Sequence, residues 1–252
     1  MSDSGNSPTD GHSTGSASGS AARGGGSADG GDSSSRVPSP TRASQAGRAQ
    51  RAERRRADIL AAARTVFLRD GYHDAKLTGV AREAGCSVGT LYTYFTDRDA
   101  LLAAVLSEVE EEMRAAGRPA APEDGRPVSP AAQISATNRA YLASYRRNRA
   151  IMALMEQVAQ ADESFGRQRL LRADGFIDRN SRALQRLVDA GEIALDDPEM
   201  TATALSAAVS RLAYVAWVDG RFPDTDEVFE RMCSTADRIW LGTLGLSPDS
   251  VK

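Results

Sequence analysis

Hydroxyl-bearing and small residues are gathered in one short segment that follows Ser87. A helix over residues 88–95 would turn six of them outward: Val88, Gly89, Thr90, Tyr92, Thr93 and Tyr94. Short side chains can approach the edges of bases and the methyl group of thymine, and tyrosine hydroxyls can reach phosphates. The residue types in this segment therefore point to recognition of duplex DNA.

Basic residues surround this segment. Residues 42–100 carry eleven Lys and Arg against seven Asp and Glu, although the net charge of the whole chain is −3. A basic block on an otherwise acidic chain is an electrostatic footprint for phosphates. Its densest run consists of Arg48, Arg51, Arg54, Arg55 and Arg56. We expect Arg51, Arg54 and Arg55 to contact a DNA groove or phosphates, and the other interpretation of this run is a solvated helix face.

Residues that could carry catalysis are few. His12 lies in the N-terminal tail, and His73 stands beside Asp74 in a turn, where the role of a polar turn residue is favoured. Cys86 and Cys233 have no C-x-x-C partner and are expected to be reduced thiols; a redox switch at Cys86 is the alternative to a small hydrophobe. No Gly-rich phosphate loop, Ser/His pair or spaced Cys/His cluster occurs. The sequence thus predicts no enzyme, no catalytic residue, no metal and no cofactor.

The first half of the chain divides into a tail and a helical region. Residues 1–47 are mainly Gly, Ser, Ala and Asp, and are predicted to be disordered because they cannot bury enough apolar surface to offset their ordering entropy. Helical periodicity then predicts helices at about 50–70, 77–84 and 88–95 and a fourth that opens at Asp97. Gly71 and Gly85 end the first two helices, and the hydroxyl of Ser87 caps the third. Two short helices joined by a tight glycine-containing turn are what a helix-turn-helix requires.

The second half of the chain is also predicted to be helical. A Pro- and Gly-rich break between Gly117 and Pro130 separates the two halves. The helices expected after the break lie at about 130–147, 149–161, 164–190, 197–219 and 225–244. No stretch has the alternation typical of strands, so the predicted fold class is all-α. It comprises a three-helix helix-turn-helix domain over 48–112 and a helical effector-binding and dimerisation domain over 113–252.

The N-terminal motifs resemble the signature of the TetR family of repressors. The matching residues are Ile59-Leu60-x-Ala62-Ala63-x-x-x-Phe67-x-x-x-Gly71-Tyr72, then Val80-Ala81-x-x-Ala84-Gly85-Cys86-Ser87-x-Gly89-Thr90-Leu91-Tyr92-x-Tyr94-Phe95, then Asp97-Arg98-Asp99-Ala100-Leu101-Leu102. Many fixed spacings over about 50 residues make the resemblance specific. It implies a three-helix DNA-binding domain, a symmetric dimer, and release from DNA when an effector binds. A helical hairpin inside some other bundle is the alternative.

The resemblance also implies roles for single residues. Gly89, Thr90, Tyr92, Thr93 and Tyr94 would face the DNA, and Arg98 takes the place of a phosphate-contacting lysine. Ala75 and Lys76 replace a threonine pair that caps the second helix and touches a phosphate, so we expect Asp74 or Thr78 to cap it and Lys76 to supply the phosphate contact. Val88 stands where many relatives carry lysine. The predicted DNA-binding set is Arg51, Arg54, Arg55, Lys76, Thr78, Ser87, Val88, Gly89, Thr90, Tyr92, Thr93, Tyr94 and Arg98.

The last two predicted helices have the pattern of an interface. The helix over 197–219 is apolar nearly all round, so it must be buried on two sides, and the helix over 225–244 has apolar residues at matching spacing. The resemblance implies that they form a four-helix interface in a homodimer. Such a dimer would bind a near-palindromic operator in double-stranded DNA, with recognition helices roughly 34 Å apart.

Large side chains in the second half are candidates for an effector pocket. They are Tyr141, Tyr145, Met152, Met155, Phe176, Tyr214 and Trp217, with Phe165 beside them. Few charges interrupt these stripes, which favours a small, largely apolar effector; ordinary core packing is the other interpretation of each residue. A repressor without an effector, constitutive or controlled by a partner protein, is the alternative function.

The chain has no segment that marks it for a membrane. Its apolar runs are too short to cross a bilayer, and the N-terminus lacks the apolar region of a secretory signal. We therefore expect a cytoplasmic protein that has no membrane partner and is associated with the nucleoid when bound to DNA.

Overall fold

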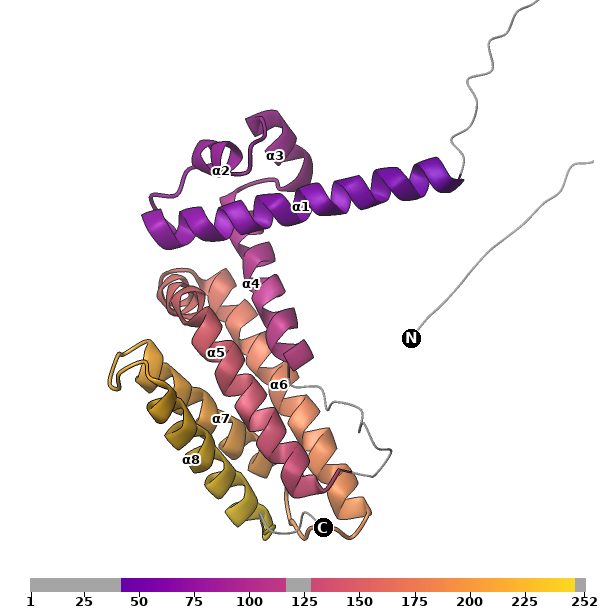
Figure 1. Ribbon diagram of the computed structural model, residues 1–252, viewed down its shortest axis with the longest axis vertical. Coiled ribbons are helices and arrows are strands. Elements are labelled where there is room, and N and C mark those ends of the chain that lie inside the picture. Colours follow the sequence, from indigo (N-terminus) through magenta and orange to yellow (C-terminus); the bar gives the residue numbers. More distant parts are fainter. Residues whose placement is uncertain (1–41, 117–127, 248–252) are drawn as a thin grey trace, which may run out of the picture. The chain divides into compact units, whose positions relative to one another are not determined.

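The computed structural model describes residues 42–116 and 128–247, which form eight helices and no strand (Figure 1). The first four helices are α1 (Arg42–Asp70), α2 (Leu77–Glu83), α3 (Val88–Tyr94) and α4 (Arg98–Ala116). The other four are α5 (Pro130–Ala161), α6 (Glu163–Asp189), α7 (Pro198–Trp217) and α8 (Asp226–Leu244). The predicted all-α class is confirmed.

Helix α1 begins earlier in the chain than predicted. It starts at Arg42 instead of near residue 50, so residues 42–47 lie in a helix and not in the predicted tail. The added turns are rich in Ala, Arg and Gln, which are good helix formers, but they lack the apolar residues on which the periodicity depends. Residues 1–41, for which disorder was predicted, lie outside the described residues.

Helix α5 is one continuous helix of 32 residues, and the prediction of two helices that break near residue 148 is wrong. The position of the predicted break is Asn148, whose side chain is almost completely buried. Its amide donates a hydrogen bond to the carbonyl of Ser144 one turn earlier (2.9 Å), which satisfies part of its hydrogen-bonding capacity within the helix. The helix therefore continues without a break at Asn148, whose buried amide is bonded to the carbonyl of Ser144.

The first hydrophobic core lies among α1 to α4 and parts of α5 and α6. Its residues with at most 1% exposure include Ile59, Leu60, Val66, Phe67, Leu91, Leu101 and Leu102. Helix α5 adds Ile151, and α6 adds Phe165, which the sequence had placed among the effector-pocket candidates. We call the part of the molecule formed by residues 59–105 the head. Its core is completed by residues far outside that range.

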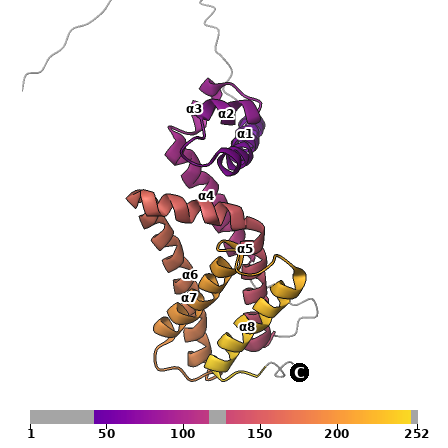
Figure 2. The same cartoon turned by 90° about the vertical axis from the view of Figure 1, so that its left-hand side faces the viewer.

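The second core lies among α5, α6, α7 and α8, where α7 packs against α6 and α8 against α5 (Figure 2). Polar contacts align α5 and α8: Asn138 donates to Asp237 (3.0 Å), and Arg139 pairs with Glu230. Met113 and Met152 pack against both cores, so the two are in direct contact through these side chains.

Side-chain caps begin the four helices that follow residue 128. Backbone N–H groups in their first turns donate to the side chains of Ser129, Asp162, Asp197 and Thr225. Gly245 adopts a φ of 66° at the end of α8, a conformation that favours glycine. None of the helices in the described ranges is both long and apolar enough to pass through a membrane.

Candidate nucleic-acid interface

Helix α3 is short and is fixed at both ends. The hydroxyl of Ser87 accepts a hydrogen bond from the backbone N–H of Thr90 at 3.0 Å, which confirms the predicted cap, and lies 2.9 Å from the hydroxyl of Thr90. Leu91 is completely buried and anchors the middle of the helix in the first core. At the other end the N–H of Phe95 donates to the carbonyl of Leu91. Seven residues suffice for this helix because a cap and one buried leucine hold it.

The outward face of α3 is narrower than predicted. The side chain of Tyr92 is 54% exposed, and Gly89 and Thr93 are also exposed. The hydroxyl of Thr93 donates to the carbonyl of Gly89 at 3.1 Å. Val88 and Tyr94 are half-buried and pack against the first core, so these two predicted contact residues also hold the helix in place.

The turn between α2 and α3 has the tight geometry that the sequence predicted. Gly85 has a φ of 61°, in the region that favours glycine. The N–H of Cys86 donates to the carbonyl of Ala81 at 2.9 Å and closes the turn. From α1, the guanidinium of Arg55 donates to the carbonyl of Ala84 at 3.3 Å. The turn is thus tied to α1 by a residue that had been predicted to contact DNA.

The start of α2 differs from the prediction. Lys76 is the N-cap residue and its side chain makes no capping hydrogen bond, so the expectation that Asp74 or Thr78 caps the helix is wrong. Thr78 is the second residue of α2, so it does not occupy the N-cap position, which belongs to Lys76. Both Lys76 and Thr78 are exposed.

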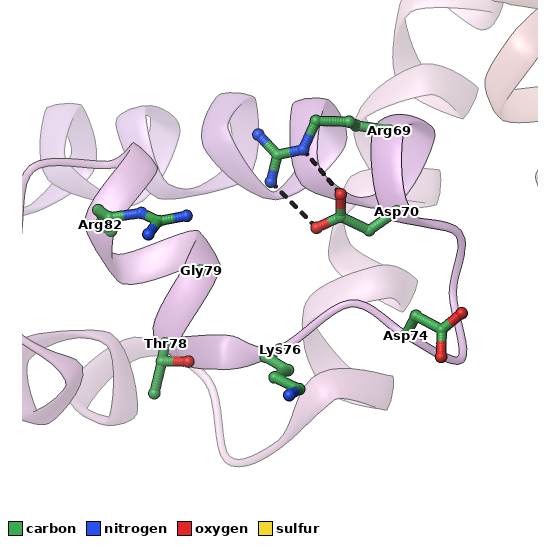
Figure 3. Close-up of a pocket in the computed structure, with 7 residues that line it drawn as sticks. All are labelled: Arg69, Asp70, Asp74, Lys76, Thr78, Gly79 and Arg82. Atoms are coloured by element: carbon green, nitrogen blue, oxygen red, sulfur yellow. Dashed lines mark hydrogen bonds and ion pairs between the residues drawn. The ribbon is translucent and has the colours of Figure 1, made fainter.

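An open hollow lies between the end of α1 and the start of α2 (Figure 3). Its volume is about 420 Å³, and its lining consists of Arg69, Asp70, Asp74, Lys76, Thr78, Gly79 and Arg82. The guanidinium of Arg69 donates to both carboxylate oxygens of Asp70, at 2.7 and 3.0 Å, and these bonds hold the pKa of that carboxyl below its ordinary value. Asp70 therefore stays charged and engaged with Arg69, which leaves Lys76 and Arg82 as the remaining cations of the hollow. Arg82 is exposed and was missed by the sequence analysis.

Arg98 is engaged within the protein. Its guanidinium donates to the carbonyl of His73 at 2.8 Å and lies over the ring of Tyr72, 4.2 Å from its centroid. The hydroxyl of Tyr72 donates to Asp99 at 2.5 Å. Burial is the largest cause that raises the pKa of Tyr72, which reaches about 12. These contacts fasten the turn after α1 to the start of α4, so the predicted phosphate-contacting residue has a structural role as well.

The exposed arginines of α1 are arranged around a helix that extends beyond the head core. Arg51 and Arg54 are exposed, while Arg55 and Arg56 are half-buried. Arg56 lies over the ring of Phe95, 5.6 Å from its centroid. The structure therefore separates arginines that the sequence had grouped.

A polar junction joins α1, α4 and α5. Arg64 of α1 donates to the amide oxygen of Asn148 at 2.6 Å, and the amide nitrogen of Asn148 donates to Glu112 of α4 at 3.2 Å. Arg147 also donates to Glu112, at 3.1 and 3.2 Å. Close by on α4, burial raises the pKa of Glu108, while the charges of Arg56 and Arg64 act in the opposite direction. This junction could not be predicted from the sequence because its members are far apart along the chain.

Most of the predicted effector residues meet in one aromatic cluster of the second core. Tyr141 lies 6.1 Å from Tyr145 and 5.0 Å from Phe176, and Tyr145 lies 6.1 Å from Trp217, between ring centroids. Tyr214 packs against the same core. Burial raises the pKa of both Tyr141 and Tyr145 above the ordinary value. We call these five residues the aromatic cluster.

Three other candidates lie elsewhere. Met155 belongs to the first core, where its sulfur accepts a contact from Arg172 at 2.7 Å. Met152 packs against both cores. Phe165 contacts Tyr72 edge to face, with 5.8 Å between the ring centroids, so it lies in the head core and not in the aromatic cluster. Their spacing on amphipathic helices did not reveal which of the two cores each residue joins.

A short capped helix with an exposed face, joined to α2 by a glycine turn, defines a helix-turn-helix protein. Residues 59–105 match the family model described as "Bacterial regulatory proteins, tetR family". The transcriptional regulator UidR of Escherichia coli (strain K12) is 34% identical over 74 residues, which is 29% of this chain and 37% of UidR. Residues 59–105 of the chain are thus similar to regulators of the TetR family. The match thus spans little more than a third of the length of this relative.

Solved structures extend the likeness of fold to most of the chain. A TetR-family regulator from Mesorhizobium loti has a TM-score of 0.62 at 19% identity, over 77% of this chain and 98% of that one. SmeT, described as the repressor of a multidrug efflux pump of Stenotrophomonas maltophilia, has a TM-score of 0.58 at 23% identity, over 75% of this chain and 89% of its own. At these identities the likeness concerns the fold. The matched relatives are regulators, not enzymes.

Proposed function

We propose that this protein is a transcriptional regulator that binds operator DNA through the exposed face of α3. The observation that carries the proposal is Tyr92, whose 54% exposed aromatic side chain stands on a helix that is capped and anchored from below. Tyrosine combines an apolar ring with a hydroxyl that can reach phosphates, and α3 has the dimensions of a recognition helix in a major groove. Gly89, Thr90 and Thr93 complete the contact surface, with Ser87, Val88 and Tyr94 at its border.

Phosphate contacts flank this surface in the proposal. Lys76, Thr78 and Arg82 belong to the hollow at the start of α2, where an exposed lysine and arginine favour an anion. Arg98 donates to the carbonyl of His73 in the turn between α1 and α2. In the proposal it supports phosphate binding by holding this turn in place and by its positive charge. Phosphate contacts of this kind fix the register of the protein on DNA, while α3 selects the sequence.

The proposed assembly is a homodimer formed through α7 and α8. Both helices keep an exposed side with small residues: Ala204, Ala207 and Ala208 on α7, and Thr235, Gly242 and Thr243 on α8. Ile239 of α8 is a large apolar residue with 37% exposure on that helix. Small residues allow a partner helix to approach closely, and a two-fold axis would repeat α3 at a spacing of about one DNA turn, roughly 34 Å. We propose a near-palindromic operator, repression, and residence on the nucleoid for this dimer.

The proposed effector site is the aromatic cluster. Its rings would provide stacking surfaces, and the tyrosine hydroxyls would provide hydrogen bonds to a small, largely apolar effector. Next to it the amide of Asn180 donates to the hydroxyl of Ser206 at 2.9 Å between two buried residues. A regulator with no effector is the second candidate. An apolar compound that changes the emission of Trp217 and lowers operator affinity would favour the first candidate.

The DNA-binding proposal is tested with duplexes selected from genomic DNA for binding to the full chain. We expect Tyr92→Ala to weaken binding of the selected duplex by about 1–3 kcal/mol, because it removes a contact at the centre of α3. Tyr92→Phe is the matched control, which keeps the ring and removes only the hydroxyl. The thermal midpoint should stay within a few degrees of wild type, since the side chain is exposed. Unchanged affinity in Tyr92→Ala would remove α3 from the interface.

A further inference from the structure

The N-terminal half of α1 extends beyond the core of the head. Among the described side chains of this helix, those from residue 45 to 58 are exposed or half-buried, and the first buried one is Ile59. Residues 42–58 span about 25 Å at the rise of an α-helix. This extension carries Arg48, Arg51, Arg54, Arg55 and Arg56.

Two contacts define the sides of α1. Arg55 donates to the carbonyl of Ala84, in the turn between α2 and α3, so its side faces the helix-turn-helix. Arg64 donates to Asn148 of α5, so its side faces the C-terminal helices. Nine residues separate Arg55 from Arg64, which corresponds to two and a half turns at 3.6 residues per turn. The two contacts therefore lie on opposite sides of the helix, as their partners require.

The side that faces the helix-turn-helix is basic along the extension. Arg51 precedes Arg55 by four residues and Arg48 by seven, so all three lie within a narrow sector of the helix surface. We call these three residues the basic stripe. Arg54 is one residue before Arg55 and points about 100° away from it. The extension thus carries exposed arginines on and off the stripe.

We propose that the basic stripe binds the phosphates of duplex DNA that flanks the sequence read by α3. The inference rests on the proposed function and adds to it a second, sequence-independent contact. Three features support it: the stripe is on the side of α1 that faces the helix-turn-helix, it is continuous with that surface through Arg55, and its charge is complementary to phosphate. A guanidinium pairs with phosphate oxygens through two parallel hydrogen bonds.

The helical form of the extension favours phosphates over the base edges of the minor groove. An α-helix with its side chains is about 10–12 Å in diameter, whereas the minor groove of B-DNA is only about 6 Å wide. An extended arm could enter that groove, but a helix lies across or along its phosphate walls. From Arg48 to Arg55 the stripe covers about 10 Å, which corresponds to roughly three base-pair steps of a DNA strand.

The test compares Arg51→Ala with Arg54→Ala in the full chain. Both residues are exposed, both changes remove one positive charge, and alanine preserves the helix. Binding is measured by fluorescence anisotropy against KCl concentration, with a selected duplex trimmed to the sequence that α3 protects and with the same duplex extended by about ten base pairs on each side. The wild type should bind the extended duplex about tenfold more tightly than the trimmed one at low salt.

For Arg51→Ala we expect about a fivefold loss of affinity for the extended duplex and a salt slope reduced by roughly two per dimer, with little change on the trimmed duplex. For Arg54→Ala we expect less than about a twofold loss on either duplex. Equal losses in the two variants, or equal binding of the two duplexes by wild type, would contradict the binding of flanking phosphates by the basic stripe. Neither outcome would affect the proposed role of α3. A wild type that binds no selected duplex would overturn the proposed function itself.

Discussion

The head and the C-terminal helices obtain their order from contacts over different distances along the chain. In the head, α3 depends on Ser87, Thr90 and Leu91, all within a few residues of one another. In the C-terminal helices, Asn138 meets Asp237 across 99 positions and Asn180 meets Ser206 across 26. Local caps and turns need few residue types at fixed spacing, whereas distant pairs can be satisfied by many combinations. This contrast explains why the family match is confined to residues 59–105 while the fold likeness covers most of the chain.

The core of the head is an exception to this contrast, because it includes a residue from a distant part of the chain. The largest predicted effect tests this exception. Phe165 lies on α6 but is 2% exposed in the first core, against the ring of Tyr72. We expect Phe165→Ala to lower the free energy of unfolding by about 3–5 kcal/mol, because it leaves a cavity in a closely packed core. Denaturant titration measures this change, and amide hydrogen exchange in α1 should rise.

The control for that prediction is Leu171→Ala. Leu171 is on the same helix and is 70% exposed, so its truncation should change stability by less than about 0.5 kcal/mol. If Phe165→Ala were as mild as this control, the head would fold without help from α6, and the contrast between the two regions would be complete.

The second prediction concerns the junction at Asn148. Asn148→Ala removes the amide that joins Arg64, Glu112 and the carbonyl of Ser144. We expect a loss of about 1–3 kcal/mol in stability, since half-buried polar groups lose their partner. Arg147→Ala should cost at most about 1 kcal/mol, because it breaks only an exposed ion pair with Glu112. Equal effects of the two variants in urea titrations would show that burial of Asn148 contributes nothing.

The smallest predicted effect is a change in alkaline stability. The pKa of Tyr72 is raised to about 12 in the folded protein, mainly by burial. The unfolded chain releases this proton near pH 10, so between pH 10 and 12 the folded state binds more protons and its stability falls as the pH rises. Tyr72→Phe should make the decline of the thermal midpoint between pH 10 and 12 less steep. A slope identical to that of wild type would contradict the burial of this hydroxyl.

Local signals in the sequence predicted most of the head. The Ser87 cap, the Gly85 turn and the buried Leu91 follow from residue types and spacing, and the structure has all three. The start of α2 was mispredicted, because Lys76 occupies the N-cap position and its side chain makes no capping hydrogen bond. The first turns of α1 were missed because a helix of Ala, Arg and Gln has no apolar stripe.

Contacts between distant segments were beyond the sequence analysis. Periodicity identifies which side of a helix is buried, and it grouped Tyr141, Tyr145 and Trp217 correctly on buried surfaces. It does not reveal which neighbour covers that side. Met155 and Phe165 were therefore assigned to the effector pocket, although both lie in the first core. Their helices, α5 and α6, carry residues of the aromatic cluster at other positions. For the same reason the role of Asn148 was not predicted, because its hydrogen-bond partners Arg64 and Glu112 belong to two other helices.

The insertion of Phe165 beneath Tyr72 has a consequence for engineering. A chimera that joins this head to the sensing portion of another regulator at the gap between α4 and α5 would lose the phenyl ring that closes the underside of the head. Such a graft would need an aromatic residue at the start of its own sixth helix, or Phe165 and the turn that precedes it transplanted along with the head. The unit that can be exchanged between regulators is therefore larger than the stretch of sequence by which the family is recognised.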